Sequence, residues 1–286
     1  MDLSAAAGSC AIRLAWRPPA VAVQGYHVYR SSADAADYQR VTAAPIRQTR
    51  FSDAAVESGK PYRYIVRALS PRGVEGPPTP PAEASAVIVR EPVFAAALDA
   101  RPAAALWGGQ TLSGKLHGKA SCTDGVLDVR SGGYLTFPHH DYFDLTQPLS
   151  VACWVAMDQP GQMPVLISCG VWNQAGWFLQ RLGGSYRWHV GGVDCDGGQP
   201  AVGRWVHLAA VYDGQSLKLY QDGQLVAQRA ASVNGVPWPG DLHVGQYSGR
   251  TTAEYQVTGR IAGLRLYHRP LEAEEIAAEA KQVPAF

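Results

Sequence analysis

Two turn-rich segments of the sequence pair a tryptophan with a polar neighbour. GVWNQAG contains Trp172 and Asn173, and GVPWPGD contains Trp238 and Asp241. An indole packs well against the apolar C–H face of a sugar ring, and nearby amide or carboxylate groups orient a small ligand. Trp188, in the strand-like run YRWHV, faces either the core or an open sheet surface. We therefore predict a carbohydrate-binding site of Trp172, Asn173, Trp188, Trp238 and Asp241. A second interpretation stays open, in which the loop tryptophans fold back as lids over the edges of the fold.

The segment Asp194-Cys195-Asp196-Gly197-Gly198 is a candidate metal site. Carboxylates at positions i and i+2 before two glycines suggest a tight turn that presents the hard oxygen ligands preferred by Ca²⁺. Asp194 and Asp196 are therefore the candidate ligands, and Ca²⁺ is the candidate cofactor. The remaining ligands of a calcium loop are missing from the pattern, so an acidic turn without a metal is the alternative.

His139-His140-Asp141, with Asp144 close by, is a second group of metal-ligating residue types. Adjacent histidines on an extended segment point in opposite directions and so rarely share one ion. We interpret this group as a polar loop between strands.

Catalytic patterns are not found in the sequence. Glycosidic cleavage needs two carboxylates at a fixed separation, and no strand-like run alternates Glu and Asp in that way. The acidic run at 272–275 lies on a predicted helix, where it most simply forms a solvated face. Neither a Gly-x-Ser-x-Gly elbow nor a glycine-rich phosphate loop follows a strand. We therefore expect this chain to be non-catalytic. This expectation does not extend to the larger protein around it, which can be a carbohydrate-active enzyme.

The composition predicts a β-sheet protein. The chain has 30 Gly and 20 Pro, and short runs of Val, Ile, Leu, Tyr and Trp recur between turn signals. A formal net charge of +1 without a basic block argues against nucleic acid as a partner. No apolar run reaches the length of about 18 residues that suggests a membrane span.

The five cysteines are an odd number and show no CxxC spacing, which argues against a zinc ribbon. Cys153 lies in the apolar run SVACWVAM, so we expect a buried thiol there. For Cys169 and Cys195, at the ends of strand-like runs, both a disulfide and two free thiols stay open.

Two Asp-Gly pairs predict a three-stranded meander. Asp213-Gly214 and Asp222-Gly223 suit tight turns with positive φ, and the flanking strands are expected at 205–212, 217–221 and 225–229. The outer face of this meander, with Lys218 and Tyr220, is expected to be the wetter one. A short helix is expected in PLEAEEIAAEAK, with a strand in VTGRIAGLRLYHR before it.

Trp16 in RLAW, the run GYHVYR, and the run YRYIVRA at 62–68 followed by a Pro/Gly-rich segment resemble a fibronectin type III domain. Tyr62 matches the position whose hydroxyl closes the corner of such sandwiches, which is a structural role. The resemblance implies a β-sandwich over residues 1–91 and says almost nothing about function. Residues 70–85 have the composition of a linker, and residues 86–90 are expected to be the last strand.

Five blocks in the expected order resemble a laminin-G-like, or concanavalin A-like, jelly-roll domain over residues 92–286. They are GVLDVRSGGYLTFP, LSVACWVAM, GWFLQRLGGSYRWHVGG, RWVHLAAVYDGQSLKLYQDGQLVA and GRIAGLRLYHRPLEAEEI. Where relatives often carry acidic residues before the last strand's apolar run, this chain has Ala262 and Gly263, so no metal role is carried over to that position. The expected fold class is therefore all-β, with two tandem β-sandwiches: a fibronectin type III sandwich and a concanavalin A-like jelly roll.

These resemblances imply a non-catalytic accessory region of a secreted, multidomain bacterial protein. The jelly roll would bind a glycan or polysaccharide, the first domain would act as a spacer, and neighbouring domains of a larger chain would be the other partners. The alternative is a structural or protein-contacting module that orients a neighbouring catalytic domain. Because the N-terminus has no signal peptide and strand-like alternation begins almost at once, we expect a fragment of an extracellular protein.

Overall fold

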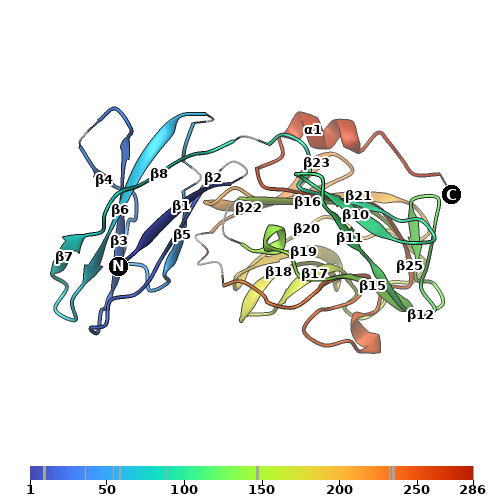
Figure 1. The fold of residues 1–286 in the computed structure, drawn as a ribbon. Coiled ribbons are helices and arrows are strands. Elements are labelled where there is room, and N and C mark those ends of the chain that lie inside the picture. The colour runs from blue at the N-terminus through green and yellow to red at the C-terminus, as the bar shows by residue number, and fades with distance from the viewer. Residues whose placement is uncertain are drawn as a thin grey trace. The chain divides into compact units, whose positions relative to one another are not determined.

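The computed structural model describes residues 1–8, 11–35, 37–53, 55–57, 59–87, 89–145, 148–231, 233 and 236–285. The chain divides into two compact units, unit 1 at residues 1–89 and unit 2 at residues 90–286 (Figure 1). Both units are built from antiparallel β-sheets. The described residues include a single, seven-residue α-helix. The chain is therefore all-β, as its turn-rich sequence predicts.

Unit 1 is a sandwich of two sheets. The first has the order β1-β2-β5, with bounds Leu3–Gly8, Ala11–Trp16 and Arg50–Asp53. The second has the order β4-β3-β6-β7, with β8 also paired to β6; the bounds of β3, β4, β6, β7 and β8 are Gly25–Ser32, Gln39–Arg40, Pro61–Leu69, Glu75–Pro78 and Ala82–Ser85. Alternate residues of each strand point between the sheets. Trp16 and Tyr26 meet there edge to face, with ring centroids 5.3 Å apart.

Residues 70–85 are part of the first sandwich, so the linker-like composition of this segment is misleading. The segment contains β7 and β8, and both strands pair with β6. Pro78 is tolerated because β7 lies at the edge of the sheet. The strand expected at 86–90 includes Ile88, which lies outside the described residues, and β8 ends before it at Ser85.

Unit 2 is a larger sandwich with sheets of ten and seven strands. The ten-stranded sheet has the order β11-β10-β9-β25-β16-β21-β22-β23, with β13 and β14 paired beside β25. In chain order its strands are Phe94–Ala97 (β9), Ala103–Leu106 (β10), Thr111–Ser113 (β11), Ser121–Thr123 (β13), Val126–Asp128 (β14), Leu149–Met157 (β16), Val206–Tyr212 (β21), Ser216–Gln221 (β22), Gln224–Ala230 (β23) and Gly259–Tyr267 (β25).

The seven-stranded sheet, which carries most of the residues discussed below, has the order β12-β15-β24-β17-β18-β19-β20. In chain order its strands are Lys115–Gly118 (β12), Gly133–Phe137 (β15), Val165–Val171 (β17), Ala175–Leu182 (β18), Ser185–Val190 (β19), Val193–Gly197 (β20) and Leu242–Val244 (β24). Two short 3-10 helices complete the unit, η1 at Asp141–Phe143 and η2 at Ala253–Tyr255.

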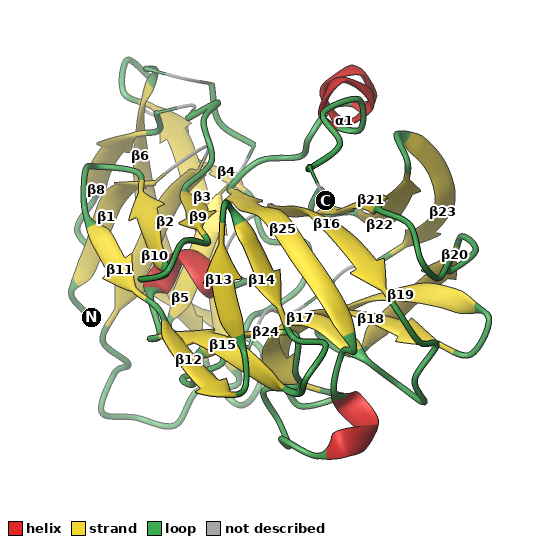
Figure 2. Cartoon of the chain, turned by 90° about the vertical axis from the view of Figure 1, so that its right-hand side faces the viewer, coloured by secondary structure: helices red, strands yellow, loops and turns green. Residues whose placement is uncertain are grey.

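Strand β16 is buried along its whole length because both of its faces are covered. Its odd-numbered residues, from Leu149 to Met157, belong to the main core between the two sheets. On the other face, Ala152 packs in a separate cluster with Leu271 and with Ile276 of helix α1, Ala273–Glu279. Figure 2 shows α1 on the outer side of this sheet. None of the helices in the described chain has the length and apolar character needed to cross a membrane.

The predicted meander is confirmed as β21, β22 and β23. Asp222 and Gly223 both have positive φ, at 50° and 83°, as the tight turn between β22 and β23 requires. The expectation of a wetter outer face is wrong at Tyr220, which is buried together with Ile276. The face is covered because the C-terminal helix folds back over it.

Four cysteines of unit 2 are buried free thiols: Cys122, Cys153, Cys169 and Cys195. No disulfide therefore joins Cys169 to Cys195 in this structure. Burial raises the pKa of the Cys122 thiol to about 11, with a smaller contribution from Asp99, and it raises the pKa of Cys153 to about 12. Cys10 lies outside the described residues.

Candidate functional site

The turn between β17 and β18 presents a tryptophan to solvent. The Trp172 side chain is 53% exposed, and the exposed residue Asn173 beside it has the left-handed φ of 55° that asparagine tolerates. The backbone N–H of Trp172 donates a 2.6 Å hydrogen bond to the Tyr247 hydroxyl. The turn is therefore tied to the body of unit 2 while its indole remains accessible.

His189 of β19 is hydrogen-bonded to the backbone of the same turn. The imidazole is 1% exposed and stacks on Phe178, with ring centroids 4.4 Å apart. Its Nε2 accepts long hydrogen bonds from the backbone N–H groups of Asn173 (3.5 Å) and Gly192 (3.4 Å). Since those partners can only donate, Nε2 carries no proton, and Nδ1–H donates to Asp194 at 2.6 Å. Burial lowers the pKa of His189, outweighing the opposite effect of Asp194, so the neutral form is favoured.

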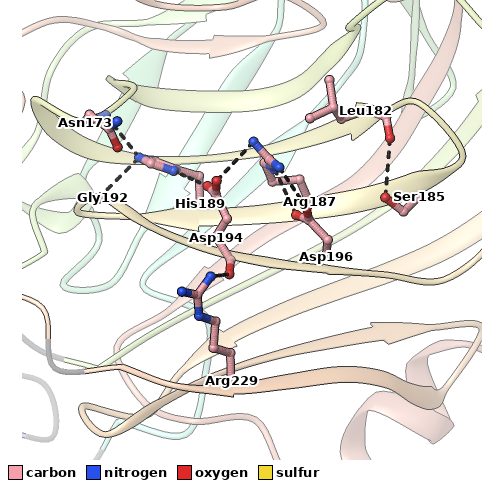
Figure 3. A network of polar contacts seen from close by, with 9 residues as sticks. All are labelled: Asn173, Leu182, Ser185, Arg187, His189, Gly192, Asp194, Asp196 and Arg229. Carbon is pink, nitrogen blue, oxygen red and sulfur yellow. Dashed lines mark hydrogen bonds and ion pairs between the residues drawn. The ribbon is translucent and has the colours of Figure 1, made fainter.

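Asp194 and Asp196 lie on strand β20 and not in the tight turn expected from the sequence. Figure 3 shows the Arg187 guanidinium reaching both carboxylates. Arg187 donates from Nε and Nη2 to the two oxygens of Asp196, at 2.8 and 2.7 Å, and its Nη1 is 3.0 Å from Asp194 Oδ2. Asp196, opposite Arg187 in the strand register, is thus bound in a bidentate manner.

This arrangement does not fit the proposed Ca²⁺ site. Calcium takes six to eight oxygen ligands, and here the carboxylate oxygens of Asp194 and Asp196 are already engaged by Arg187 and His189. The backbone oxygen of Asp194 is also used, because Arg229 of β23 donates to it at 2.7 Å. The groove beside these residues, between β20 and β23, has a volume of about 250 Å³ and is lined in part by the same side chains.

Trp238 and Asp241 lie in the segment that leads into β24. Trp238 is only partly exposed and packs against the main core, and its Nε1 is buried without a hydrogen-bond partner among the described residues. The segment is held beside the Trp172 turn, because the Val236 carbonyl accepts from Gly176 N–H at 3.0 Å. Asp241 is exposed. Trp238 thus has the geometry of a lid, whereas Asp241 is accessible.

Trp188 lies inside the sandwich. It is fully buried and packs against Trp177, with ring centroids 5.7 Å apart. Its strand neighbours Arg187 and His189 point to the opposite face, as the period of two requires. The alternation was recognisable in the sequence, but its phase was not. As a contact for a carbohydrate, Trp188 does not fit the structure.

Trp107, in the turn between β10 and β11, is an accessible tryptophan that the sequence-based argument overlooked. It is 41% exposed, and its carbonyl accepts a 3.3 Å hydrogen bond from the Tyr142 hydroxyl. The sequence did contain a turn signal at this position, since Trp107 is followed by Gly108 and Gly109. Both glycines adopt positive φ in the structure.

The polar segment after β15 brings three side chains together. Ligand atoms of His139, Asp141 and Asp144 lie within 4.8 Å of one another. In the strand register Phe137 pairs with Leu242, and Ser168 of β17 pairs with His243. The residues that follow β15, precede β24 and follow β17 therefore share one end of the seven-stranded sheet. This end, which we call the loop edge, comprises residues 139–144, 172–174 and 236–241.

A family model described as the concanavalin A-like lectin/glucanases superfamily, a laminin G family, matches residues 129–277, just over half of the chain. Mouse pappalysin-1 is 56% identical over 34 residues, which are 12% of this chain and 2% of pappalysin-1. The match to pappalysin-1 therefore concerns a small part of both proteins.

Solved structures similar to this chain include binding domains of botulinum neurotoxins. The binding domain of neurotoxin DC in complex with SialylT has a TM-score of 0.52 and 9% identity, over 68% of this chain and 51% of that one. A type C structure, from work on cell entry that depends on two ganglioside molecules, has a TM-score of 0.54 and 10% identity, over 68% and 51%. The chain thus spans about half the length of these proteins, and at such identities the likeness concerns the fold alone.

Proposed function

Since the chain belongs to the concanavalin A-like lectin/glucanases superfamily, we propose that unit 2 is a non-catalytic carbohydrate-binding module. The observation that carries the proposal is the exposed indole of Trp172 on a turn held by Tyr247 and His189. An aromatic ring on a backbone that is already ordered loses little conformational freedom when a ligand stacks on it. A sugar ring offers the flat apolar face that such a platform binds.

Polar groups at the loop edge supply the rest of the proposed site. Asn173 and Asp241 are both exposed there, and amide and carboxylate groups hydrogen-bond sugar hydroxyls. Trp172, Asn173 and Asp241 are thus the proposed contacts, and Trp238 closes the edge behind them. The neurotoxin domains solved with SialylT and studied with gangliosides share the fold and agree with this choice of ligand class.

We further propose that the module does not catalyse a reaction. Glycoside hydrolysis uses one carboxyl group as an acid and a second as base or nucleophile, with free access to the substrate. Asp194 and Asp196, which are neighbours on one face of β20, are instead tied to Arg187. Incubating the folded chain with the polysaccharides that it retains, followed by an assay for reducing ends, tests this part of the proposal.

Unit 1 is proposed to be a fibronectin type III spacer, with the domain division near residue 91. In support of this proposal, its β1-β2-β5 and β4-β3-β6-β7 sheets form an antiparallel β-sandwich, which is the architecture of fibronectin type III domains. In addition, the Tyr62 hydroxyl accepts a 3.2 Å hydrogen bond from the backbone N–H of Glu57, five residues upstream near the start of β6. That contact agrees with the corner role inferred for Tyr62 from the sequence. We also propose that the larger protein is secreted.

The test is retention on glycans. The whole chain is screened on a glycan array that includes sialylated glycans and on polysaccharide affinity gels, and W172A is then compared with wild type on the retained ligand. We expect W172A to weaken binding about tenfold or more, equivalent to about 1.4 kcal/mol. L225A is the control, because it removes an exposed apolar side chain from β23 of the other sheet, and we expect it to keep the wild-type affinity.

Two outcomes count against the proposal. One is a folded wild-type chain that none of the glycans retains, and the other is unchanged retention after W172A. Either would favour the alternative, a protein-contacting module that orients a neighbouring catalytic domain. In that case, deleting this region from the larger protein would lower enzymatic activity without changing retention on carbohydrate.

A further inference from the structure

The segment between β15 and β16 holds side chains that the carbohydrate-binding proposal leaves unused. One imidazole nitrogen from His139 and one carboxylate oxygen each from Asp141 and Asp144 lie within 4.8 Å of one another. We propose that these three residues bind a divalent transition-metal ion. Zn²⁺ fits this set of one nitrogen and two oxygen ligands.

The backbone of η1 sets the two carboxylates side by side. Asp144 N–H donates to the Asp141 carbonyl at 3.2 Å, an i to i+3 bond of the 3-10 type. In this geometry the side chains at positions i and i+3 are nearly eclipsed. Asp141 and Asp144 therefore point to the same side of the turn.

Only one of the two adjacent histidines is required, which removes the objection that they point in opposite directions. His140 caps η1: its Nδ1 accepts from Tyr142 N–H at 3.2 Å, and its ring packs on that of Tyr142 with centroids 4.5 Å apart. His139 faces the carboxylates instead, with Nε2 at 3.4 Å from Asp144 Oδ1. His140 thus caps η1, whereas His139 is the proposed metal ligand.

Burial makes Asp144 the fixed ligand and leaves the other two free to adjust. Asp144 is 7% exposed, and its neighbour Phe143 is anchored in the core, where the Phe143 carbonyl accepts from Trp177 Nε1 at 2.8 Å. Ligand atoms around one tetrahedral zinc ion stand about 3.3 Å apart. Asp141, which is exposed, and His139, whose side chain is 32% exposed, reach this spacing by rotating towards Asp144.

Charge separates this group from the acidic pair on β20. Asp194 and Asp196 share the Arg187 guanidinium, whereas the group facing Asp144 Oδ1 is the imidazole of His139, itself a proposed ligand. As metal ligands, two carboxylates supply two negative charges, which a divalent cation balances. One imidazole nitrogen and two carboxylate oxygens favour Zn²⁺ and other first-row divalent transition-metal ions. Ca²⁺ is disfavoured because it prefers oxygen ligands alone.

Isothermal titration of the whole, chelator-treated chain with Zn²⁺ tests the proposal, with Ca²⁺ titrated for comparison. We expect one equivalent of Zn²⁺ to bind, and we expect H139Q and D141N each to weaken binding by more than about tenfold. Both substitutions are at accessible side chains, and near-UV circular dichroism checks that the variants are folded. D196N is the matched control, because it removes a carboxylate of the rival acidic pair, and it should leave zinc binding unchanged.

Cobalt provides a second readout that identifies the ligands. Co²⁺ bound by nitrogen and oxygen gives visible d–d bands without the intense thiolate charge-transfer absorption that cysteine ligands produce. Four results would each overturn the proposal. The wild-type chain could show no saturable zinc binding, or H139Q and D141N could bind zinc as tightly as wild type. D196N could lose zinc binding, or the cobalt spectrum could contain a thiolate band. W172A should retain the metal, so failure of this proposal is distinguishable from failure of carbohydrate binding.

Discussion

At the scale of single residues, His189 connects the exposed turn to the interior of the sheet. Its Nε2 accepts from the backbone of Asn173, and its Nδ1–H donates to Asp194. The same carboxylate contacts Arg187, so the network runs from the Trp172 turn to the edge strand β20. A neutral imidazole is needed at this position, because a second proton on Nε2 would face backbone N–H groups that can only donate.

Protonation of His189 should therefore destabilise the fold. Its pKa is lowered in the folded state, mainly by burial, so the unfolded chain binds more protons as the pH falls below about 6.5. We expect the free energy of unfolding to be fully retained above about pH 6.5 and to decrease below it. The other histidines with lowered pKa values, His27, His117 and His243, act in the same direction.

Urea unfolding at about pH 7.5 and about pH 5.5, followed by circular dichroism, measures this effect. H189Q has no imidazole to titrate, so its stability should change less between the two pH values than that of wild type. An equal change in both proteins would show that His189 does not contribute.

The sequence placed Trp172 and Trp238 in turns but left open whether each is exposed or folds back as a lid. In the structure Trp172 is exposed, whereas Trp238 packs against the core. The sequence did not reveal that Arg187 occupies the carboxylates of Asp194 and Asp196. That contact depends on the register between β19 and β20, which local sequence patterns do not specify. Likewise, the approach of His139 to Asp144 depends on a 3-10 turn that the extended interpretation of this segment did not include.

At the scale of secondary-structure elements, helix α1 completes the outer face of the ten-stranded sheet. Ile276 is fully buried there with Leu271 and Tyr220. Polar contacts accompany the packing, because the Glu279 carboxylate accepts from the Tyr267 hydroxyl at 2.6 Å. Burial opposes ionisation of Glu279, but contacts from His207, Tyr267 and Arg265 outweigh it and lower the pKa of this carboxyl.

Truncation of Ile276 should be costly because the helix is short and depends on this contact. We expect I276A to lower the free energy of unfolding of unit 2 by about 2–5 kcal/mol, as is usual for a large buried side chain. E274A changes an exposed residue of the same helix and should stay within about 0.5 kcal/mol of wild type. Denaturant titration of the two variants provides the measurement, and similar values for both would contradict the packing role of α1.

Local signals predicted this element well. The helix was predicted within PLEAEEIAAEAK, and α1 lies inside that segment but begins three residues after Pro270, at Ala273. The Asp-Gly pairs correctly predicted the meander beneath it. The sequence did not show that the helix would cover the meander, since Tyr220 and Lys218 share a face whose exposure depends on a segment more than 50 residues further along. Alternation of apolar and polar residues along a strand does not determine which distant element will pack on it.

At the scale of the whole molecule, each unit has a core of its own. Trp16, Tyr26 and Tyr64 belong to the core of unit 1, whereas the core of unit 2 is formed between its two large sheets. A unit that buries its own apolar surface does not need the other unit in order to fold.

We therefore expect two unfolding transitions. W16A, which truncates a buried tryptophan, should destabilise unit 1 by about 3–5 kcal/mol and leave the transition of unit 2 in place. Differential scanning calorimetry distinguishes this result from a single transition that moves as a whole. Glycan retention by W16A should equal that of wild type if unit 1 is only a spacer.

The four buried thiols of unit 2 also determine how the chain responds to its surroundings. No covalent cross-link between them holds the sandwich closed, and their raised pKa values keep thiolate, the reactive form, scarce while the fold is intact. The fold of the second unit should consequently be the same whether or not a reducing agent is present.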